Sequence, residues 1–358
     1  MKRVQIGERL IGKDSPCYIV AEMSGNHQGG IEKAKEIIRQ AKRSGADAVK
    51  IQVYRPDTIT LDCDNDDFSI PAGSPWEHYK NSYNLYQCAH TPWEWIPELV
   101  ATANEQGVDI FGSVFDETSV DFMEALDTVA YKFAAPEIND IPLLRKVAQT
   151  GKPVILSTGL SELSDLELAL KTLYQHGCEQ IVLLKCTSAY PAPVDEANLK
   201  TIPSLEQIFG CPAGLSDHTI GIGVPIAAVA LGATMIEKHF MLNDGVETVD
   251  SFFSLTPSQF SEMSTAVRQV EAALGHVEYG ITAEAKKNIS ARRSLYVSAS
   301  IRKGELISAE NVKSVRPGYG LAPKYFDQIL GRKARKNMSI GDPLSWDCIE
   351  PCVFSKML

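Results

Sequence analysis

Two short segments in the second half of the chain combine residue types that bind metal ions and transfer protons. Residues 216–219 read Ser-Asp-His-Thr, and residues 237–239 read Glu-Lys-His. Each segment follows an apolar run, so we predict that both lie at the ends of β-strands. Because strand side chains alternate in direction, each histidine shares its side with the residue two positions earlier. If the strands are neighbours, His218 and His239 converge and form half of a divalent-metal site with open positions.

The alternative is that both histidines are structural and bond to backbone carbonyls. A single histidine favours that interpretation, since histidine is commonly buried in protein cores. Two histidines at the carboxyl ends of two strands favour the metal site.

Strand and helix patterns alternate eight times between about residue 17 and residue 275. The predicted strands are residues 18–22, 48–54, 109–114, 130–135, 154–158, 181–187, 213–217 and 234–240. The predicted helices are residues 31–44, 92–105, 119–126, 142–149, 165–176, 199–209, 224–231 and 257–274. Eight such repeats predict an α/β fold with a (β/α)₈ TIM barrel. A doubly wound open sheet is the alternative, but no glycine-rich dinucleotide motif follows the first strand.

Local signals mark several helix ends. Thr91 with Glu94, and Thr256 with Gln259, predict capped helix starts. Glycines stand where five helices should stop, at positions 45, 107, 151, 177 and 232.

We predict a catalytic barrel over residues 1–279, a linker over 280–291 and a small β domain over 292–352. The small domain is rich in turn signals and buries only a limited core. Residues 55–90 form a long insertion after the second strand. An insertion of that length in a compact domain is usually a functional loop or a lid.

The composition excludes several classes of protein. The chain has 358 residues, is 44% hydrophobic and carries a net charge of -10, which argues against general nucleic-acid or anionic-membrane binding. We expect no signal peptide after Met1 and no membrane span. The eight cysteines include no C-x-x-C motif, so we expect reduced thiols in the cytoplasm. Cys348 and Cys352 are interpreted as part of an ordinary tail rather than a metal site.

The active site of a barrel enzyme lies at the carboxyl ends of its strands. Parity predicts three inward lysines there, Lys50, Lys132 and Lys185. Hydroxyl groups accompany them at Ser113, Ser157 and Ser216. Cations and hydroxyl donors around one cavity favour a small polyanion such as a phosphate ester.

Other chemistries remain open at this stage. Glu22, Glu137 and Glu237 could form the paired carboxylates of a glycosidase. Lys132 or Lys185 could serve as the nucleophile of a Schiff-base aldolase. A non-catalytic, sugar-binding barrel is a third possibility, less favoured because the polar set at the strand ends is nearly complete.

Many separate motifs, in order and over nearly the whole chain, resemble the sialic acid synthase family. They are Ala21-Glu22-Met23-Ser24-Gly25-Asn26-His27, Val49-Lys50-Ile51-Gln52, Tyr131-Lys132, Ile155-Leu156-Ser157-Thr158-Gly159, Lys185-Cys186-Thr187-Ser188-Ala189-Tyr190-Pro191, residues 214–218 and Glu237-Lys238-His239-Phe240. The tail, with Arg292-Arg293-Ser294-Leu295 and Val315-Arg316-Pro317-Gly318, resembles the antifreeze-like (SAF, β-clip) domain of that family. Residues 91–95 and 186–190 look most like the pseudaminic acid synthase branch.

The resemblance implies a phosphoenolpyruvate-dependent transferase that forms a carbon–carbon bond. Phosphoenolpyruvate, water and an open-chain acetamido-sugar would give a nine-carbon 2-keto sugar acid and phosphate, with C–O cleavage. The branch favours 2,4-diacetamido-2,4,6-trideoxy-L-altrose as the sugar and pseudaminic acid as the product. N-acetylneuraminate and legionaminate synthases are the alternatives, because the sequence does not fix the sugar.

The resemblance also implies roles for individual residues. The residues expected to hold phosphoenolpyruvate are Lys50, Ser113, Lys132, Ser157, Ser188, Tyr190 and Ser216. His218 and His239 would bind Mn²⁺ or Mg²⁺. The residues expected to position the sugar or move protons are Glu22, Gln52, Glu137 and Asp250. Ala135 stands where the family typically has a serine, so one hydroxyl contact to the phosphate is absent or replaced.

The resemblance further implies a homodimer in which each small domain covers the barrel mouth of its partner. Arg316 would then reach the sugar bound by the other protomer. Without the resemblance, Arg316 would be interpreted equally well as a surface arginine beside a turn.

Overall fold

The computed structural model describes residues 2–28 and 30–351. The chain divides into two compact units, one ending at Gly275 and the other beginning at His276. Cys352, the last residue of the predicted small domain, lies outside the described residues. The predicted boundaries at 279/280 and 291/292 stay predictions.

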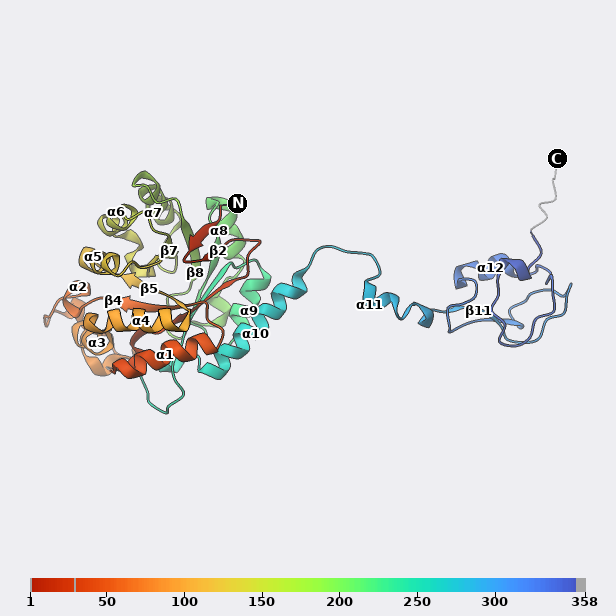
Figure 1. Cartoon of the computed structure of the whole chain (residues 1–358), viewed down its shortest axis with the longest axis horizontal. Coiled ribbons are helices and arrows are strands. Elements are labelled where there is room, and N and C mark those ends of the chain that lie inside the picture. Colours follow the sequence, from red (N-terminus) through yellow and green to blue (C-terminus); the bar gives the residue numbers. More distant parts are fainter. Residues whose placement is uncertain (1, 29, 352–358) are drawn as a thin grey trace. The chain divides into compact units, whose positions relative to one another are not determined.

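The first unit is a closed barrel of eight parallel strands, as predicted (Figure 1). The strands in chain order are β3 (Tyr18–Glu22), β4 (Ala48–Val53), β5 (Asp109–Val114), β6 (Tyr131–Phe133), β7 (Val154–Ser157), β8 (Ile181–Cys186), β9 (Ala213–Asp217) and β10 (Met235–His239). Strand β10 pairs with both β9 and β3, which closes the barrel. Every strand falls within its predicted segment because apolar runs bounded by turn residues are a strong signal.

Helices cover the outside of the barrel. They are α1 (Ile31–Arg43), α4 (Ile96–Gln106), α5 (Glu117–Ala125), α6 (Ile141–Ala148), α7 (Leu163–Gln175), α8 (Thr201–Phe209), α9 (Gly223–Ala230) and α10 (Pro257–Leu274). Their apolar faces share one core cluster with the outward strand residues, for example Ile37 and Leu99 with Val49. All five predicted stop glycines have positive φ, a conformation that glycine adopts without steric cost.

One of the two predicted helix caps is wrong. Thr256 and Gln259 form the capping box of α10. Thr91 does not cap α4, which begins at Ile96 after a 3₁₀ turn over Trp93–Trp95. The Thr91 hydroxyl instead lies 3.1 Å from His27 Nε2 in the interior. Thr91 therefore contacts His27, which is distant in sequence, and does not bond to the backbone at the start of α4.

A short hairpin that the sequence patterns did not predict precedes the barrel. It pairs β1 (Val4–Ile6) with β2 (Arg9–Ile11). Its buried Val4, Ile6 and Ile11 pack with inward-facing barrel residues such as Tyr18 and Phe111. The hairpin therefore covers the amino-terminal end of the barrel, away from the carboxyl ends of the strands.

The insertion after β4 carries regular structure of its own. It contains α2 (Pro56–Ile59), α3 (Ser82–Ala89) and two 3₁₀ turns, over Asp66–Phe68 and Glu77–Tyr79.

In the described ranges, no helix has both the length and the apolar character that a bilayer crossing needs.

The second unit is small and mostly irregular. It contains α11 (Ala283–Lys286), α12 (Phe326–Ile329) and an antiparallel pair, β11 (Ser294–Val297) with β12 (Val312–Val315). Its own core is built from Leu295, Val297, Ile301, Ile307, Val312, Ile329, Ala334, Met338, Leu344, Cys348 and Ile349. Cys348 is thus a buried core residue.

Candidate active site

A cavity of about 280 Å³ opens at the carboxyl ends of the barrel strands. Eleven of the residues singled out by sequence line it, namely Lys50, Gln52, Ser113, Lys132, Ser157, Tyr190, Ser216, His218, Glu237, His239 and Asp250. Ala135 also lines it. The strand ends therefore bring together most of the predicted site in one place.

The two histidines converge, as the strand parity predicts. Strands β9 and β10 are parallel neighbours, with Ser216 opposite Glu237. The ring centroids of His218 and His239 are 5.3 Å apart. Both rings are buried and line the same cavity. Two imidazoles from adjacent strand ends are thus available to one ligand.

The surroundings of both rings favour the neutral imidazole. His218 Nδ1 lies 3.0 Å from the carbonyl oxygen of Thr187. That oxygen can only accept, so Nδ1 carries the proton and Nε2 keeps its lone pair. His239 Nδ1 is buried without a hydrogen-bond partner. Burial lowers the pKa of His218 to about 4 and that of His239 well below its usual range.

Neutral imidazoles with an unused nitrogen fit a metal ion. The described residues hold no cluster of three or more His, Cys, Asp or Glu side chains arranged as ligands. His218 and His239 could therefore supply two ligands of a metal ion, and the other positions would fall to water or substrate.

Lys50 lies between two buried carboxylates. Its Nζ is 2.7 Å from Glu237 Oε1 and 3.2 Å from Glu22 Oε2. Burial acts to lower the pKa of Lys50, but the two carboxylates outweigh it and raise that pKa above its usual value. Lys50 is therefore a fixed cation on the cavity wall.

Lys132 is held differently. Its Nζ donates to Ser157 Oγ at 2.7 Å and to the Phe133 carbonyl oxygen at 2.9 Å. The nearest carboxylate oxygen, on Glu237, is 3.9 Å away. Burial lowers the pKa of Lys132 to about 8. An anionic ligand beside this amine would favour its charged form.

Glu237 connects the two lysines. Its Oε1 accepts from Lys50 and, at 3.1 Å, from Ser216. Burial acts to raise the pKa of Glu237, yet Lys132 and Lys50 hold it low, at about 2. Its Oε2 has no hydrogen-bond partner, and neither does the buried Ser113 Oγ. Both atoms are therefore available to hydrogen-bond a polar ligand or water in the cavity.

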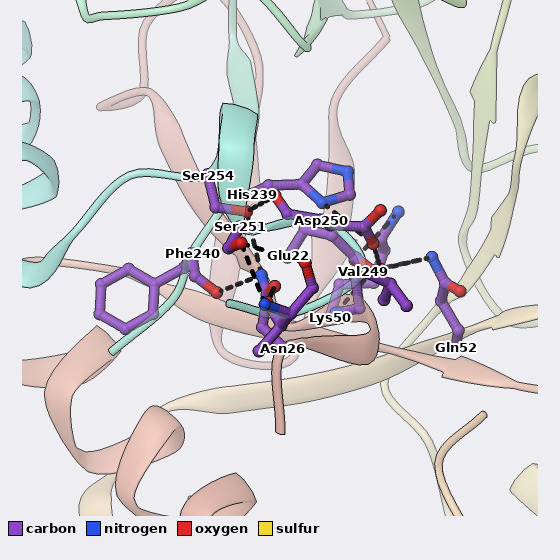
Figure 2. A network of polar contacts seen from close by, with 12 residues as sticks. Glu22, Asn26, Lys50, Gln52, His239, Phe240, Val249, Asp250, Ser251 and Ser254 are labelled. Carbon is purple, nitrogen blue, oxygen red and sulfur yellow. Dashed lines mark hydrogen bonds and ion pairs between the residues drawn. The ribbon is translucent and has the colours of Figure 1, made fainter. Parts of the chain in front are cut away.

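A second polar group lies around Glu22 and Asp250 (Figure 2). Glu22 Oε1 accepts from Ser24 N at 3.0 Å and from Gln52 at 3.2 Å. Asp250 accepts from the Ser24 hydroxyl and lies 3.9 Å from His239 Nδ1. Burial raises the pKa of Glu22 to about 7 and that of Asp250 to about 6. Both carboxyls can therefore exchange protons near neutral pH.

Asn26 anchors the loop that carries Asp250, and sequence reasoning assigned it no role. Its amide donates to the Phe240 carbonyl oxygen and to Ser254 Oγ, both at 3.0 Å (Figure 2). Ser254 Oγ in turn donates to the Asp250 carbonyl oxygen at 2.6 Å. One buried amide therefore connects both ends of the loop between β10 and α10.

We expect Asn26→Ala to loosen that loop. The change leaves buried partners unsatisfied, which costs about 1–3 kcal/mol. Hydrogen exchange should rise over residues 241–255, and the thermal midpoint should fall. Asn104→Ala, at an exposed position on α4, serves as the control. Unchanged exchange in the loop would show that Asn26 does not anchor it.

Glu137 lies in the turn after β6, next to Pro136, which lines the cavity. Its Oε2 is buried without a hydrogen-bond partner. Burial raises its pKa from an ordinary 4.5 to about 7. The wild type therefore loses stability as pH rises through that interval, because the folded state binds the extra proton.

We expect Glu137→Gln to remove this pH-dependent loss. The variant should have the higher thermal midpoint at pH 8, and the difference should disappear toward pH 5. Thermal unfolding across that range measures it, with the exposed Glu105→Gln as control. A difference that is constant with pH would contradict the assignment.

The structure places other predicted residues outside the central cavity. Lys185 does not face inward, so that prediction is wrong. The residues of β8 that join the interior cluster are Val182 and Leu184, which turns Lys185 outward. Lys185 Nζ donates to the Cys186 carbonyl oxygen at 2.7 Å. With Ser188 it lines a separate pocket of about 400 Å³.

Arg316 belongs to the second unit, directly after β12, and is exposed. Its predicted role in a partner's site stays a prediction.

Sequence reasoning missed several residues that line the cavity. Cys186 takes the inward position on β8, with Sγ 3.8 Å from His218 Nδ1. The insertion contributes Trp76, Leu85, Tyr86 and Ala89. The predicted functional insertion was the only signal for them, and it does not indicate which side chains face the site.

Comparison with known proteins identifies the family of this chain. The NeuB family model matches residues 37–279, and the SAF domain model matches residues 292–350. A pseudaminic acid synthase of Campylobacter jejuni is 44% identical over 341 residues, covering 95% of this chain and 98% of that protein. An N,N'-diacetyllegionaminic acid synthase of Legionella pneumophila is 34% identical, covering 95% and 96%.

Solved structures agree as well. The spore coat polysaccharide biosynthesis protein of Bacillus subtilis matches with a TM-score of 0.67 and 34% identity, covering 98% of this chain and 100% of that one. The matched barrel and SAF models and these full-length likenesses lead to one conclusion: the chain belongs to the NeuB family.

Proposed function

We propose that this protein is a pseudaminic acid synthase. It condenses phosphoenolpyruvate with 2,4-diacetamido-2,4,6-trideoxy-L-altrose and water to give pseudaminic acid and phosphate. The observation that carries the proposal is one cavity that holds a neutral histidine pair together with the cations Lys50 and Lys132. The greater identity to a pseudaminic than to a legionaminic acid synthase supports this sugar over the alternative.

The lysine side of the cavity suits phosphoenolpyruvate. Lys132 and Lys50 supply positive charge, and the hydroxyls of Ser113, Ser157 and Ser216 supply hydrogen bonds. Ser113 Oγ has no protein partner, so it can donate to a phosphate oxygen without breaking an existing bond. Ala135 offers no hydroxyl at the same wall. The Tyr190 ring lies 4.4 Å from that of His218, between centroids, and would contact phosphoenolpyruvate from that side.

His218 and His239 would hold Mn²⁺ or Mg²⁺. The bound ion would act as a Lewis acid on the aldehyde oxygen and stabilise the negative charge that develops there. The protein's part is to keep both imidazoles neutral and in place, through the Thr187 carbonyl on one ring and burial on the other.

The reaction joins C3 of phosphoenolpyruvate to the aldehyde carbon. Water adds at C2, the bond from C2 to the phosphate oxygen breaks, and inorganic phosphate leaves. Glu22 and Asp250 take up or release protons near neutral pH, since their pKa values are raised to about 7 and about 6. Gln52, hydrogen-bonded to Glu22, helps position the sugar, and Glu137 is a further candidate for proton transfer.

The remaining assignments belong to the same proposal. Ser188, which lines the neighbouring pocket with its Oγ 3.8 Å from the Sγ of the cavity residue Cys186, would bind at the edge of the phosphoenolpyruvate site. Arg316 would reach the sugar of the partner in a homodimer. A cytoplasmic location suits the seven cysteines of the described residues, all of which are free.

The proposal is tested by following phosphate release from phosphoenolpyruvate with purified protein. The pseudaminate precursor, the legionaminate precursor and N-acetylmannosamine are compared, with Mn²⁺, with Mg²⁺ and with a chelator. We expect release only when a sugar and a divalent cation are both present, and fastest with the pseudaminate precursor. Full activity in the presence of the chelator would refute the metal requirement, and preference for another sugar would refute the assigned substrate.

A further inference from the structure

The cavity has two walls of different chemistry. One wall carries the lysines, hydroxyls and histidines described above. The other wall is apolar and comes from the insertion and from the loop after β10. Its members are Trp76, Leu85, Ala89 and Val249. These four residues, the apolar wall, carry no charged group or hydroxyl that would bind phosphoenolpyruvate.

Trp76 is fixed in this wall by three contacts. Its indole N–H donates to the Val249 carbonyl oxygen at 2.7 Å. Its ring lies 5.7 Å from that of Tyr190 and 6.0 Å from that of Phe252, both edge to face. The insertion is thereby joined to the loops after β8 and β10. A side chain held on three sides provides a defined binding surface.

Leu85 and Ala89 lie four positions apart on α3, so they share one face of that helix. Val249 packs close to the same region. A Cβ added at Gly25 would lie 2.4 Å from Val249 Cγ2 and 3.1 Å from the Ala89 carbonyl oxygen. The glycine thus lets the end of β3 approach the apolar wall, which keeps the wall close to the site.

We propose that the apolar wall binds the apolar substituents of the sugar and sets the preference for a 6-deoxy, diacetamido substrate. This inference rests on the proposed function and deepens it. The pseudaminate precursor carries a methyl group at C6 and two acetamido methyls. N-acetylmannosamine carries one acetamido group and a hydroxymethyl group at C6.

The physical basis is an asymmetry of solvation. A methyl group gains free energy when an apolar surface removes it from water. A hydroxyl pressed against the same surface loses its water partners and finds none in exchange. One methylene in a hydrophobic pocket changes kcat/KM by about 10-fold or more. The wall therefore favours the deoxy sugar without any specific hydrogen bond.

The test replaces Leu85 by asparagine, which is similar in size but polar. We expect kcat/KM for the pseudaminate precursor to fall about 10-fold or more. The KM for phosphoenolpyruvate and the thermal midpoint should stay unchanged. N-acetylmannosamine, used as substrate or as competitive inhibitor, should bind as well as before or better. Leu61→Asn is the matched control, because Leu61 lies in the same insertion but is 61% exposed.

A second variant keeps the test decisive if Leu85→Asn unfolds. Trp76→Phe retains an aromatic ring but removes the N–H that donates to Val249, and it should lower kcat/KM for the deoxy sugar more than for N-acetylmannosamine. Equal changes for both sugars, or no change, would overturn the inference. A wild type that prefers N-acetylmannosamine would instead overturn the proposed substrate, so the two failures are distinguishable.

Discussion

Replacing His218 by alanine should slow phosphate release from phosphoenolpyruvate by about a thousandfold or more, in a protein that remains folded. A Lewis-acidic cation contributes several kcal/mol of transition-state stabilisation, and each 1.4 kcal/mol corresponds to about a factor of ten in rate. With one of the two imidazoles removed, the cation has a single firm ligand left, His239. Calorimetric titration with Mn²⁺ should accordingly show weakened binding.

The control for this prediction is His176→Ala. His176 follows the last turn of α7, where its Nδ1 lies 2.8 Å from the Thr172 carbonyl oxygen, and it does not line the cavity. That variant should keep the wild-type rate and Mn²⁺ affinity. If His218→Ala retains activity and metal affinity, the histidine pair is structural and the proposed chemistry fails. Phosphoenolpyruvate binding, measured separately, shows whether the lysine side of the cavity is still intact in the variant.

The barrel could be predicted because its signals are local and repeated. Each strand is a short apolar run, and a glycine stops several of the helices between them. The convergence of the two histidines could also be predicted, because each lies at the end of its strand and shares its side with the residue two positions earlier. His218 and His239 therefore converge as expected.

The same reasoning failed for β8 because both faces of that strand are buried. Leu183 packs against the helices, and Leu184 packs inside the barrel. Because both faces carry apolar residues, the sequence does not determine which side chains of β8 point into the barrel. The inward prediction for Lys185 is therefore wrong, and Cys186 takes the inward position. The direction of the β8 side chains depends on the register between β8 and its neighbouring strands, which is set only in the folded barrel.

Residues from the insertion could not be predicted for a different reason. Trp76 reaches the cavity through contacts with the loops after β8 and β10, which are more than 100 residues away in the chain. Asn26 likewise acts through Phe240 and Ser254. Such tertiary contacts leave no periodic pattern in the sequence. They place side chains of the insertion at the cavity, whereas Lys50, Lys132 and Ser216 lie on the regular strands.

Replacing Lys50 by methionine should abolish activity and also destabilise the barrel by about 3–5 kcal/mol. Lys50 Nζ is the partner of both Glu237, at 2.7 Å, and Glu22, at 3.2 Å, and all three side chains are at most 6% exposed. Without the cation, two buried carboxylates face each other. The thermal midpoint should fall by on the order of 10 °C.

The loss of thermal stability in Lys50→Met should be larger at high pH than at low pH. Removing Lys50 takes away a positive charge that lowers the pKa of Glu22, so this pKa, already raised to about 7 by burial, rises further. A group with a raised folded-state pKa contributes stability at low pH and loses it as pH rises. The difference between wild type and Lys50→Met should therefore be larger at pH 8 than at pH 5. Lys146→Met serves as control, because its partner Asp121 is 66% exposed.

The double variant Lys50→Met/Glu22→Gln separates stability from function. It neutralises one of the two stranded carboxylates, so much of the thermal midpoint should return. Glu237 still has Lys132, 3.9 Å away, as a partner. Activity should not return, because the cavity still lacks the Lys50 cation and has also lost Glu22, a candidate for proton transfer. Recovery of both would mean that Lys50 only balances charge within the barrel, and the phosphoenolpyruvate site would then rest on Lys132 alone.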